Sequence, residues 1–321
     1  MKKLILSVLL ITIIFPGTSL AQKARMSYPG TAGVNVPFWL THEAGLFKKY
    51  GLNDEVLLIA GSVTTMQALL AGEIQFVNSS GSPAINARLQ GADVAIVASY
   101  YNSMPYGLVV NKDIRSLEDV KGKRMAVASL GGINEAAIRF VLEKSGLNVR
   151  DVTFIQAGGD SSRIAAVQSG AAAGTVLAPP GLFVATRQGL KILADLGDLE
   201  AKYPTSIIAT RRSYLTQDRP TIKKFLMALV EGLHLYKSNR KLAIDVLQKY
   251  AKISDQELVS KSHDYLVKHT SLLPIVEPSV IKAAVPAGKD TDRTIGDLYD
   301  NSALQELIKE GFVEKVSKGY K

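Results

Sequence analysis

The side chains with the clearest chemical potential are hydroxyl and amide groups that gather in six glycine-rich segments. These segments are residues 29–36, 61–64, 78–82, 129–134, 158–162 and 179–181. Each is expected to join a strand to a helix start, where unpaired backbone N–H groups suit oxyanions and polar head groups. A single serine there is more often a helix cap than a ligand contact. The prediction of a site for a small polar solute therefore rests on the six segments together.

Acid–base and metal motifs are incomplete. Residues 159–161 resemble the nucleophile motif of one hydrolase class, but no Asp precedes any histidine by three residues to serve as its partner. His42 and Glu43 lack the second histidine of a zinc protease motif. Glu231 and His234 have the spacing of half a carboxylate–metal motif, without the second half. The sequence also lacks a P-loop and a dinucleotide fingerprint, so we expect no enzyme activity, no cofactor and no metal.

The roles of two ionisable residues remain open. Arg163 directly follows the segment 158–162, where it could pair with an anionic ligand or point to solvent. His42 lies one turn inside the first expected helix and could contact ligand or pack against the core.

A repeated unit is expected to position the polar segments. Residues 60–83 show a polar turn, an amphipathic helix ending at Gly72, a short apolar strand and a second polar loop. The pattern returns at residues 157–181, with Gly170 in the place of Gly72. Alternating strands and helices indicate βαβ units and parallel sheets, in which ligands bind beyond the carboxyl ends of the strands. The repeat therefore predicts two α/β lobes whose strand ends face one cleft.

The chain is expected to cross between the lobes twice. The first crossover is predicted within residues 100–111, and the return near residues 205–210. Beyond Pro220, apolar residues recur at helical spacing, which predicts helices that return to cover the first lobe. We thus expect a first lobe of residues 22–104 plus 211–321 and a second lobe of residues 105–210.

The first 21 residues predict a secretory signal peptide. Lys2 and Lys3 precede an apolar run that ends at Phe15, and small residues follow up to Ala21. The run is shorter than the roughly 20 apolar residues of a membrane span, so cleavage after Ala21 is expected. The chain contains no cysteine for a disulfide or a lipid anchor. These features predict an exported protein of the periplasm.

Charge gives no indication of a nucleic-acid partner. The net charge of +9 falls to +7 without residues 1–21, which carry two lysines and no acidic residue. The remaining basic residues form scattered pairs, not a stripe with interleaved aromatic residues. We therefore expect a solvated basic surface.

Three segments resemble a known family. PFWLTHEAGLFKKYGL (37–52), QALLAGEIQFV (67–77) and IRSLEDVKGKRMAVAS (114–129) are similar to segments of the solute-binding proteins of ABC importers, in the sulfonate, nitrate and thiamine-precursor group. The resemblance covers nearly the whole mature chain. It implies a type II periplasmic binding fold, in which two α/β lobes with parallel-rich sheets close on a ligand. One enzymatic branch of this group carries a cysteine-rich iron motif, which this sequence lacks.

The resemblance also implies contacts and partners. Matching loops would contribute Thr31, Asn35, Phe38, Ser62, Ser79, Ser80, Ser129, Gly131, Gly132, Asn134, Asp160 and Pro179. Phe38, Trp39, Tyr101 and Tyr106 would allow a planar ligand. The implied protein is a monomer that delivers a small polar or anionic organic solute to an inner-membrane ABC permease. Two alternatives are an exported enzyme on the same fold and a binding lobe that feeds a sensor.

Overall fold

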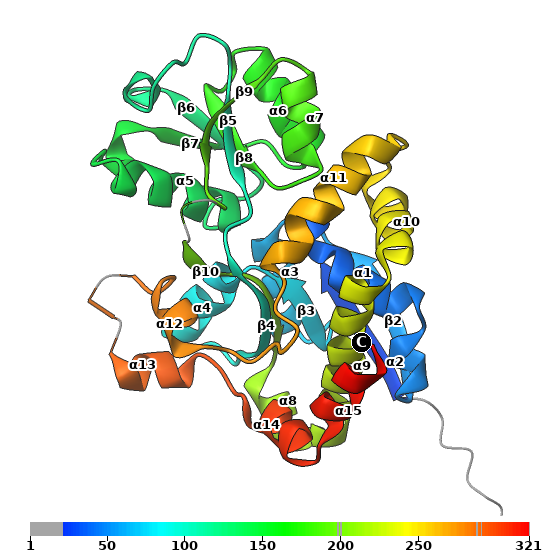
Figure 1. The fold of residues 1–321 in the computed structure, drawn as a ribbon. Helices are drawn as coiled ribbons and strands as arrows, with labels where there is room; N and C mark the ends of the chain where they lie inside the picture. Colours follow the sequence, from blue (N-terminus) through cyan, green and yellow to red (C-terminus); the bar gives the residue numbers. More distant parts are fainter. Residues whose placement is uncertain (1–21, 198, 200, 287, 290, 321) are drawn as a thin grey trace, which may run out of the picture.

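The computed structural model describes residues 22–197, 199, 201–286, 288–289 and 291–320. These residues form two lobes, each built on one five-stranded sheet surrounded by helices (Figure 1). The predicted signal peptide, residues 1–21, lies outside the described residues.

The sheet of the first lobe mixes parallel and antiparallel pairs. Its strand order is β2 (Leu52–Leu58), β1 (Gln22–Tyr28), β3 (Phe76–Ser79), β10 (Lys202–Thr210) and β4 (Ala95–Ser103). β1 pairs in parallel with β2 and β3, whereas β10 runs antiparallel to β3 and β4. Four of the five strands therefore share one direction, as predicted for a parallel-rich sheet.

The sheet of the second lobe repeats this arrangement. Its strand order is β7 (Thr153–Gln156), β6 (Arg124–Val127), β8 (Gly174–Leu177), β5 (Gly107–Val110) and β9 (Lys191–Asp195). β6 pairs in parallel with β7 and β8, and β5 runs antiparallel to β8 and β9.

The return crossover lies earlier in the chain than the sequence predicted. The first crossover falls between β4, which ends at Ser103, and β5, which begins at Gly107, inside the expected range. For the return, we expected residues 205–210, but β10 already pairs with the first sheet from Lys202. Ile207 and Ala209 are fully buried there, so the apolar segment TSIIAT is an inner strand and not a connection. The chain returns to the first lobe between residues 195 and 202.

The helices of the first lobe come from both ends of the chain. The N-terminal part contributes α1 (Val36–Glu43), α2 (Leu46–Lys49), α3 (Ser62–Leu70) and α4 (Gly81–Leu89). The C-terminal part contributes α8 (Arg212–Gln217), α9 (Arg219–Ser238), α10 (Arg240–Ala251), α11 (Gln256–Leu266), α12 (Pro278–Lys282), α13 (Asp292–Asp297), α14 (Ser302–Lys309) and α15 (Phe312–Gly319). Helix α9 packs against α1 and α2, with Phe225 against Phe47. The C-terminal helices thus cover the first lobe, as the helical spacing predicted.

The second lobe has three α-helices in the described part of the chain. They are α5 (Ile133–Lys144), α6 (Asp160–Gln168) and α7 (Gly181–Arg187). Four 3-10 turns complete the two lobes: η1 (Gly33–Asn35), η2 (Glu118–Val120), η3 (Val149–Asp151) and η4 (Val267–His269). In Figure 1, α11 rises from the first lobe and meets α7 of the second.

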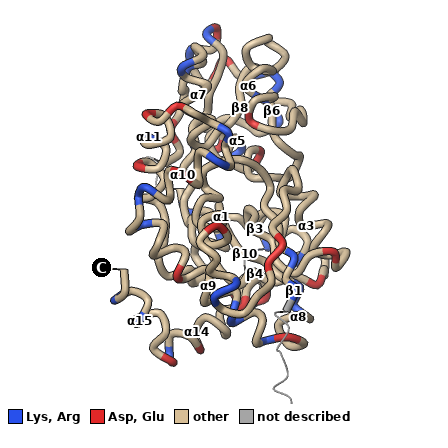
Figure 2. The backbone as a smooth tube through the Cα atoms, turned by 90° about the vertical axis from the view of Figure 1, so that its right-hand side faces the viewer, with Lys and Arg blue, Asp and Glu red and all other residues tan. Residues whose placement is uncertain are grey.

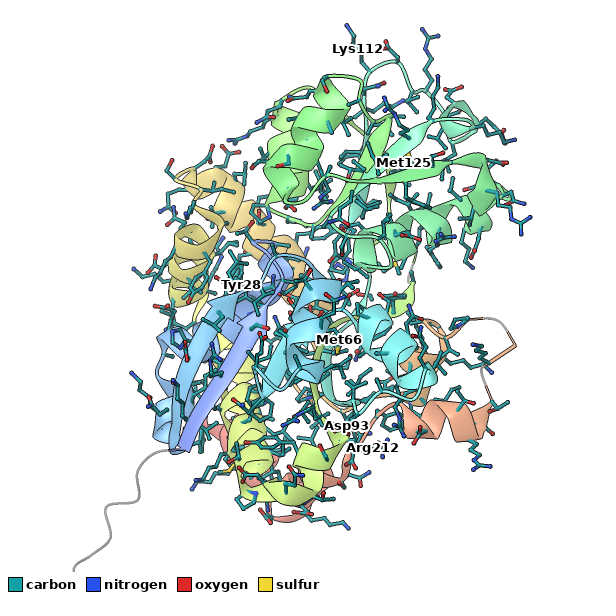
Figure 3. All side chains as sticks on the ribbon, turned by 180° about the vertical axis from the view of Figure 1, so that it is seen from behind. Tyr28, Met66, Asp93, Lys112, Met125 and Arg212 are labelled. Atoms are coloured by element: carbon teal, nitrogen blue, oxygen red, sulfur yellow. The ribbon has the colours of Figure 1, made fainter. Side chains whose placement is uncertain are left out.

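Buried apolar side chains fill both lobes and the connection between them. Met66 lies inside the first lobe and Met125 inside the second (Figure 3). One continuous cluster also includes Tyr101 and Met104, next to the first crossover. None of the described helices combines the length and the hydropathy that a membrane span requires.

Charged residues of both signs are distributed over the two lobes without a basic stripe (Figure 2).

Candidate functional site

A cavity of ≈ 310 Å³ lies where the two lobes meet. This is within the size range of small-molecule sites. The first lobe lines it with Pro29, Gly30, Thr31, Ala32, Val34, Asn35, Leu58, Ala60, Gly61, Ser62, Ser79, Ser80, Thr205 and Ser206. The second lobe lines it with Tyr106, Ala128, Ile133, Asn134, Gln156, Gly158, Gly159, Asp160, Arg163 and Ala178. The carboxyl ends of strands from both sheets therefore face the same space, as the repeat predicted.

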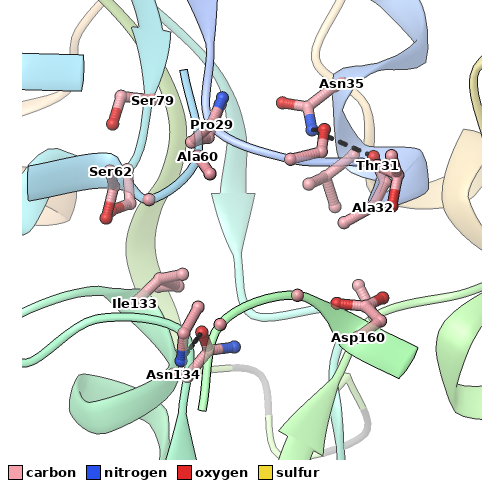
Figure 4. A pocket seen from close by; sticks show the side chains of 18 of the residues that line it. Pro29, Thr31, Ala32, Asn35, Ala60, Ser62, Ser79, Ile133, Asn134 and Asp160 are labelled. Carbon is pink, nitrogen blue, oxygen red and sulfur yellow. Dashed lines mark hydrogen bonds between the residues drawn. The ribbon is translucent and has the colours of Figure 1, made fainter. Parts of the chain in front are cut away.

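Many of the predicted contact residues line this cavity. They are Thr31, Asn35, Ser62, Ser79, Ser80, Asn134 and Asp160. Figure 4 shows those of the first lobe facing Asn134 and Asp160 of the second.

Other predicted contacts lie outside the cavity wall. Phe38 is fully buried in the first lobe, where its ring packs 6.0 Å from that of Phe47. The carbonyl of Pro179 accepts a hydrogen bond from the Gly33 N–H at 2.9 Å and thereby joins the lobes. These two residues therefore support the site without lining it.

The 129–132 loop touches the first lobe beside the cavity. Ser82 Oγ donates to the carbonyl of Gly131 at 3.3 Å, across the two lobes. A Cβ on Gly132 would lie 3.1 Å from Ser62 Oγ and 2.8 Å from Ser129 Oγ. Ser129, Gly131 and Gly132 are thus interlobe contacts, and the structure does not place them in the cavity wall.

Three hydroxyl groups at the first lobe have no hydrogen-bond partner within the described structure. Ser79, Ser80 and Thr205 are each 3% exposed, and their side-chain oxygens are unpaired. A buried polar group without a partner costs about 1–3 kcal/mol, and such groups are uncommon in folded proteins. All three line the cavity. A solute that hydrogen-bonds to them would offset this cost. The sequence interpretation missed Thr205 because it assigned β10 to the second lobe.

Backbone N–H groups add to this polar wall. Helices α3, α4 and α5 begin at the cavity after Gly61, Ser80 and Gly132, and none has a side-chain hydrogen bond at its N-cap. The first N–H groups of a helix have no intrahelical partner, and they carry a partial positive charge. Together with the hydroxyls, they suit a ligand with oxygen acceptors.

The two asparagines of the wall are already hydrogen-bonded. Asn35 Nδ2 donates to the carbonyls of Gly30 at 2.9 Å and Ala32 at 3.1 Å, and its Oδ1 accepts from Asn78 at 2.8 Å. Asn134 Nδ2 donates to the Val176 carbonyl at 3.1 Å. These amides fix the loops that surround the cavity.

Arg163 points inward and binds its own lobe. It is 4% exposed, and its Nε donates to the Gly158 carbonyl at 3.1 Å. Its Nη1 donates to Thr175 Oγ1 at 3.1 Å and to the Val176 carbonyl at 2.5 Å, while its Nη2 forms an ion pair with Asp160 Oδ1. The i, i+3 spacing of Asp160 and Arg163 on a helix could have predicted this pair. His42, the other open residue, pairs with Asp54 and does not line the cavity.

Among the aromatic residues proposed for a planar ligand, Tyr106 lines the cavity in the described structure. Phe38, Trp39 and Tyr101 are buried in the core instead. Burial, and then the nearby charge of Asp160, raise the pKa of Tyr106 well above its ordinary value. Tyr106 is therefore a neutral phenol at every physiological pH.

The structure gives no support to metal chemistry in the part of the chain that it describes. No group of three or more metal-ligating side chains is found among those residues. Glu231 is occupied by hydrogen bonds from Lys49 Nζ at 2.7 Å, Tyr50 Oη at 2.6 Å and Tyr320 Oη at 2.6 Å.

Comparisons with known proteins place the chain in a family. The model of the family described as "NMT1/THI5 like" matches residues 34–241. YtlA, a putative binding protein of Bacillus subtilis (strain 168), is 22% identical over 289 residues, which are 88% of this chain and 86% of YtlA. A putative binding protein of Brucella abortus (strain 2308) is 23% identical over 275 residues, or 81% of this chain and 82% of its own.

Solved structures show the same fold. The alkanesulfonate-binding protein SsuA from Xanthomonas axonopodis pv. citri, bound to MOPS, has a TM-score of 0.70 and 21% identity, and the match covers 88% of this chain and 96% of SsuA. The periplasmic nitrate-binding protein NrtA from Synechocystis PCC 6803 has a TM-score of 0.74 and 17% identity, covering 90% and 89%. At these identities the likeness shows the fold alone. The fold is that of the periplasmic binding proteins, which confirms the predicted fold class.

Proposed function

The chain belongs to the NMT1/THI5-like family, and we propose that it is the solute-binding component of an ABC importer. It captures a small polar or anionic organic solute between its lobes and delivers it to a permease in the inner membrane. A sulfonate, a nitrate-like anion or a pyrimidine-like thiamine precursor fits this description. The protein acts as a monomer in the periplasm.

The observation that carries this proposal is the interlobe cavity with unpaired hydroxyl groups. Ser79, Ser80 and Thr205 need acceptors or donors that the described chain does not supply. A solute that enters between open lobes would lose its hydration, and the hydroxyls and the backbone N–H groups would replace the lost hydrogen bonds. Binding free energy of this kind favours lobe closure.

The ionisable residues of the cavity wall do not favour an enzyme. Asp160 and Arg163 are the charged residues that line the cavity in the described structure, and they are paired with each other. A general acid or base must reach a proton on the substrate, and among the described residues of the second wall the ionisable groups are the Asp160–Arg163 ion pair and the neutral phenol of Tyr106. The relatives named above are described as putative binding proteins.

A binding screen tests the proposal. Purified protein, freed of bound solute by unfolding and refolding, is tested by thermal shift and native mass spectrometry against sulfonates, nitrate, pyrimidines and aromatic acids. A ligand at 100 times its Kd stabilises the folded state by about 2.7 kcal/mol, which raises the Tm measurably. The bound compound should be recovered unchanged. Recovery of a product would support the enzyme alternative, and failure to bind across the panel would count against transport.

A pair of variants localises the binding. Ser80→Ala removes one of the unpaired cavity hydroxyls and should weaken the binding of any ligand found by roughly 10-fold. Ser145→Ala, at an exposed position beyond α5, should leave the Kd unchanged. Equal affinities in the two variants would place the solute elsewhere.

A further inference from the structure

The two ends of the cavity offer opposite hydrogen-bonding chemistry. One end is formed by Ser62, Ser79 and Ser80 of the first lobe with Asn134 of the second. The other end is formed by Thr31 of the first lobe and Asp160 of the second. Figure 4 shows Ser62, Ser79 and Asn134 on one side of the view and Thr31 and Asp160 on the other. We call them the hydroxyl end and the carboxylate end.

The hydroxyl end is suited to oxygen acceptors. Ser79 and Ser80 are almost completely buried there with unpaired hydroxyl groups. The uncapped starts of α3, α4 and α5 point backbone N–H groups at the same region. Donors therefore converge on this end, and a carboxylate, sulfonate, nitro or carbonyl group can satisfy them.

The carboxylate end presents a hydrogen-bond acceptor to the cavity. The Arg163 guanidinium already donates to Gly158, Thr175, Val176 and Asp160, so it is committed to the second lobe. Asp160 uses Oδ1 in this ion pair, and its side chain is 20% exposed at the cavity wall. Its second oxygen, Oδ2, lies beside Gly181 at the start of α7, where a Cβ would overlap with it, so glycine at residue 181 leaves the carboxylate its place in the wall.

A ligand with acceptors alone would place an acceptor beside the Asp160 carboxylate. An ionised carboxylate accepts hydrogen bonds and donates none, and an acceptor group placed beside Asp160 would meet a like charge. No unpaired Lys or Arg lines the cavity among the described residues. A donor on the ligand is therefore the group that completes this end.

We propose that the cavity takes a small solute with two unlike polar ends, an oxygen-rich group at the hydroxyl end and an N–H donor, such as an amine, at Asp160. This inference rests on the proposed function, because it assumes that the interlobe cavity is the solute site. It narrows the ligand to molecules in which an acidic or oxo group and an amino group occupy opposite ends.

Matched ligand pairs test the inference with the unaltered protein. In 4-aminobenzoate and 4-methylbenzoate, or in β-alanine and butyrate, a methyl group replaces the amino group at nearly constant size. A hydrogen bond to a charged acceptor is strong enough to favour the amino compound by roughly 10-fold or more in Kd, measured by calorimetry. A methyl compound that binds equally well or better would overturn the inference while leaving the proposed function intact.

A variant then assigns the preference to one residue. Asp160→Asn should reduce the ratio of the Kd of the methyl compound to that of the amino compound to about 2-fold or less. The matched control Asp245→Asn, an exposed change on α10, should retain the ratio of the unaltered protein. Circular dichroism establishes that each variant is folded, and an Asp160 variant that fails to fold leaves the ligand pairs as the test.

If neither member of any pair binds, the solute released by denaturing the purified protein is identified by mass spectrometry. A solute without an N–H donor overturns the inference, and the absence of any binding counts against the proposed function itself.

Discussion

At the scale of single residues, two carboxylates have different roles, one in the cavity wall and one in the scaffold. Asp160 is in the cavity wall, whereas Glu231 on α9 binds the C-terminal end of the chain through Tyr320. Burial acts to raise the pKa of Glu231, but hydrogen bonds from Lys49, Tyr320 and Tyr50 outweigh it and lower the pKa. Glu231 is thus ionised in the folded protein, and its half-motif with His234 has a structural role.

Substitution of Glu231 should reduce stability in a pH-dependent way. Glu231→Gln removes a charge that accepts hydrogen bonds from three residues, with an expected loss of about 2 kcal/mol in the free energy of unfolding at pH 7. A lowered folded-state pKa stabilises the protein above the unfolded pKa, about 4.3, and this contribution disappears as pH falls through the folded value. The difference between wild type and variant should therefore shrink below about pH 4, as measured by urea unfolding.

The control for this prediction is Glu314→Gln. Glu314 is exposed on α15 and pairs with Lys318, so its substitution should change stability by less than about 0.5 kcal/mol. A Glu231 variant as stable as this control would contradict the structural role.

Residue types in the loops predicted the site better than any single motif did. Thr31, Ser62, Ser79, Ser80 and Asp160 belong to the polar segments singled out in the sequence, and all of them line the cavity. The sequence was a poorer guide where a residue on a helix could face either the cavity or the core. Phe38 was expected to contact the ligand, but its side chain is buried in the core. Helical periodicity alone does not show which face of a helix meets a ligand.

At the scale of elements, the repeated unit places corresponding loops on both walls. Its first copy is α3, β3 and α4, and its second is α6, β8 and α7. Gly72 and Gly170 end the first helix of each copy with φ values of 80° and 75°, a conformation that favours glycine. The glycine alignment was therefore a reliable signal. The boundary at β10 was not, because a buried antiparallel strand and an apolar connection have the same composition.

Helix α11 of the first lobe is linked to α7 of the second by ion pairs, and loss of these pairs should weaken solute binding. Arg187 on α7 forms ion pairs with Asp255 and, at 3.4 Å, with Glu257 at the start of α11. Exposed pairs of this kind contribute about 0–1 kcal/mol. Arg187→Ala should accordingly raise the Kd of the solute by about 2- to 5-fold at low salt, and the effect should decrease at high salt. Calorimetry at two ionic strengths measures it.

Arg240 offers a matched control, because it also forms an ion pair with α11. It forms an ion pair with Asp264 of α11 at 2.9 Å, but within the first lobe. Arg240→Ala should leave the Kd almost unchanged. An equal effect of the two substitutions would mean that α11 acts through the stability of the first lobe and not through lobe closure.

At the scale of the whole molecule, two short connections join lobes that are otherwise built around separate sheets. The resemblance in the sequence predicted two α/β lobes with parallel-rich sheets, and the structure has this architecture. It did not predict the contacts that hold the lobes together, such as the bond from Gly33 to Pro179. Those contacts depend on how closely two surfaces approach, and no local pattern in the sequence encodes that distance.

An interlobe disulfide should show whether the cavity must open to exchange its solute. A Cβ on Gly132 would lie 3.1 Å from Ser62 Oγ, close to the roughly 3 Å that separates a Cβ from the far sulfur in a disulfide, and the chain has no other cysteine to compete. The double variant Ser62→Cys/Gly132→Cys, oxidised without solute, should bind none, because the closed lobes block entry. Reduction should restore binding, and each single variant should bind with or without reductant. Equal binding before and after reduction would mean that solute reaches the cavity without lobe opening.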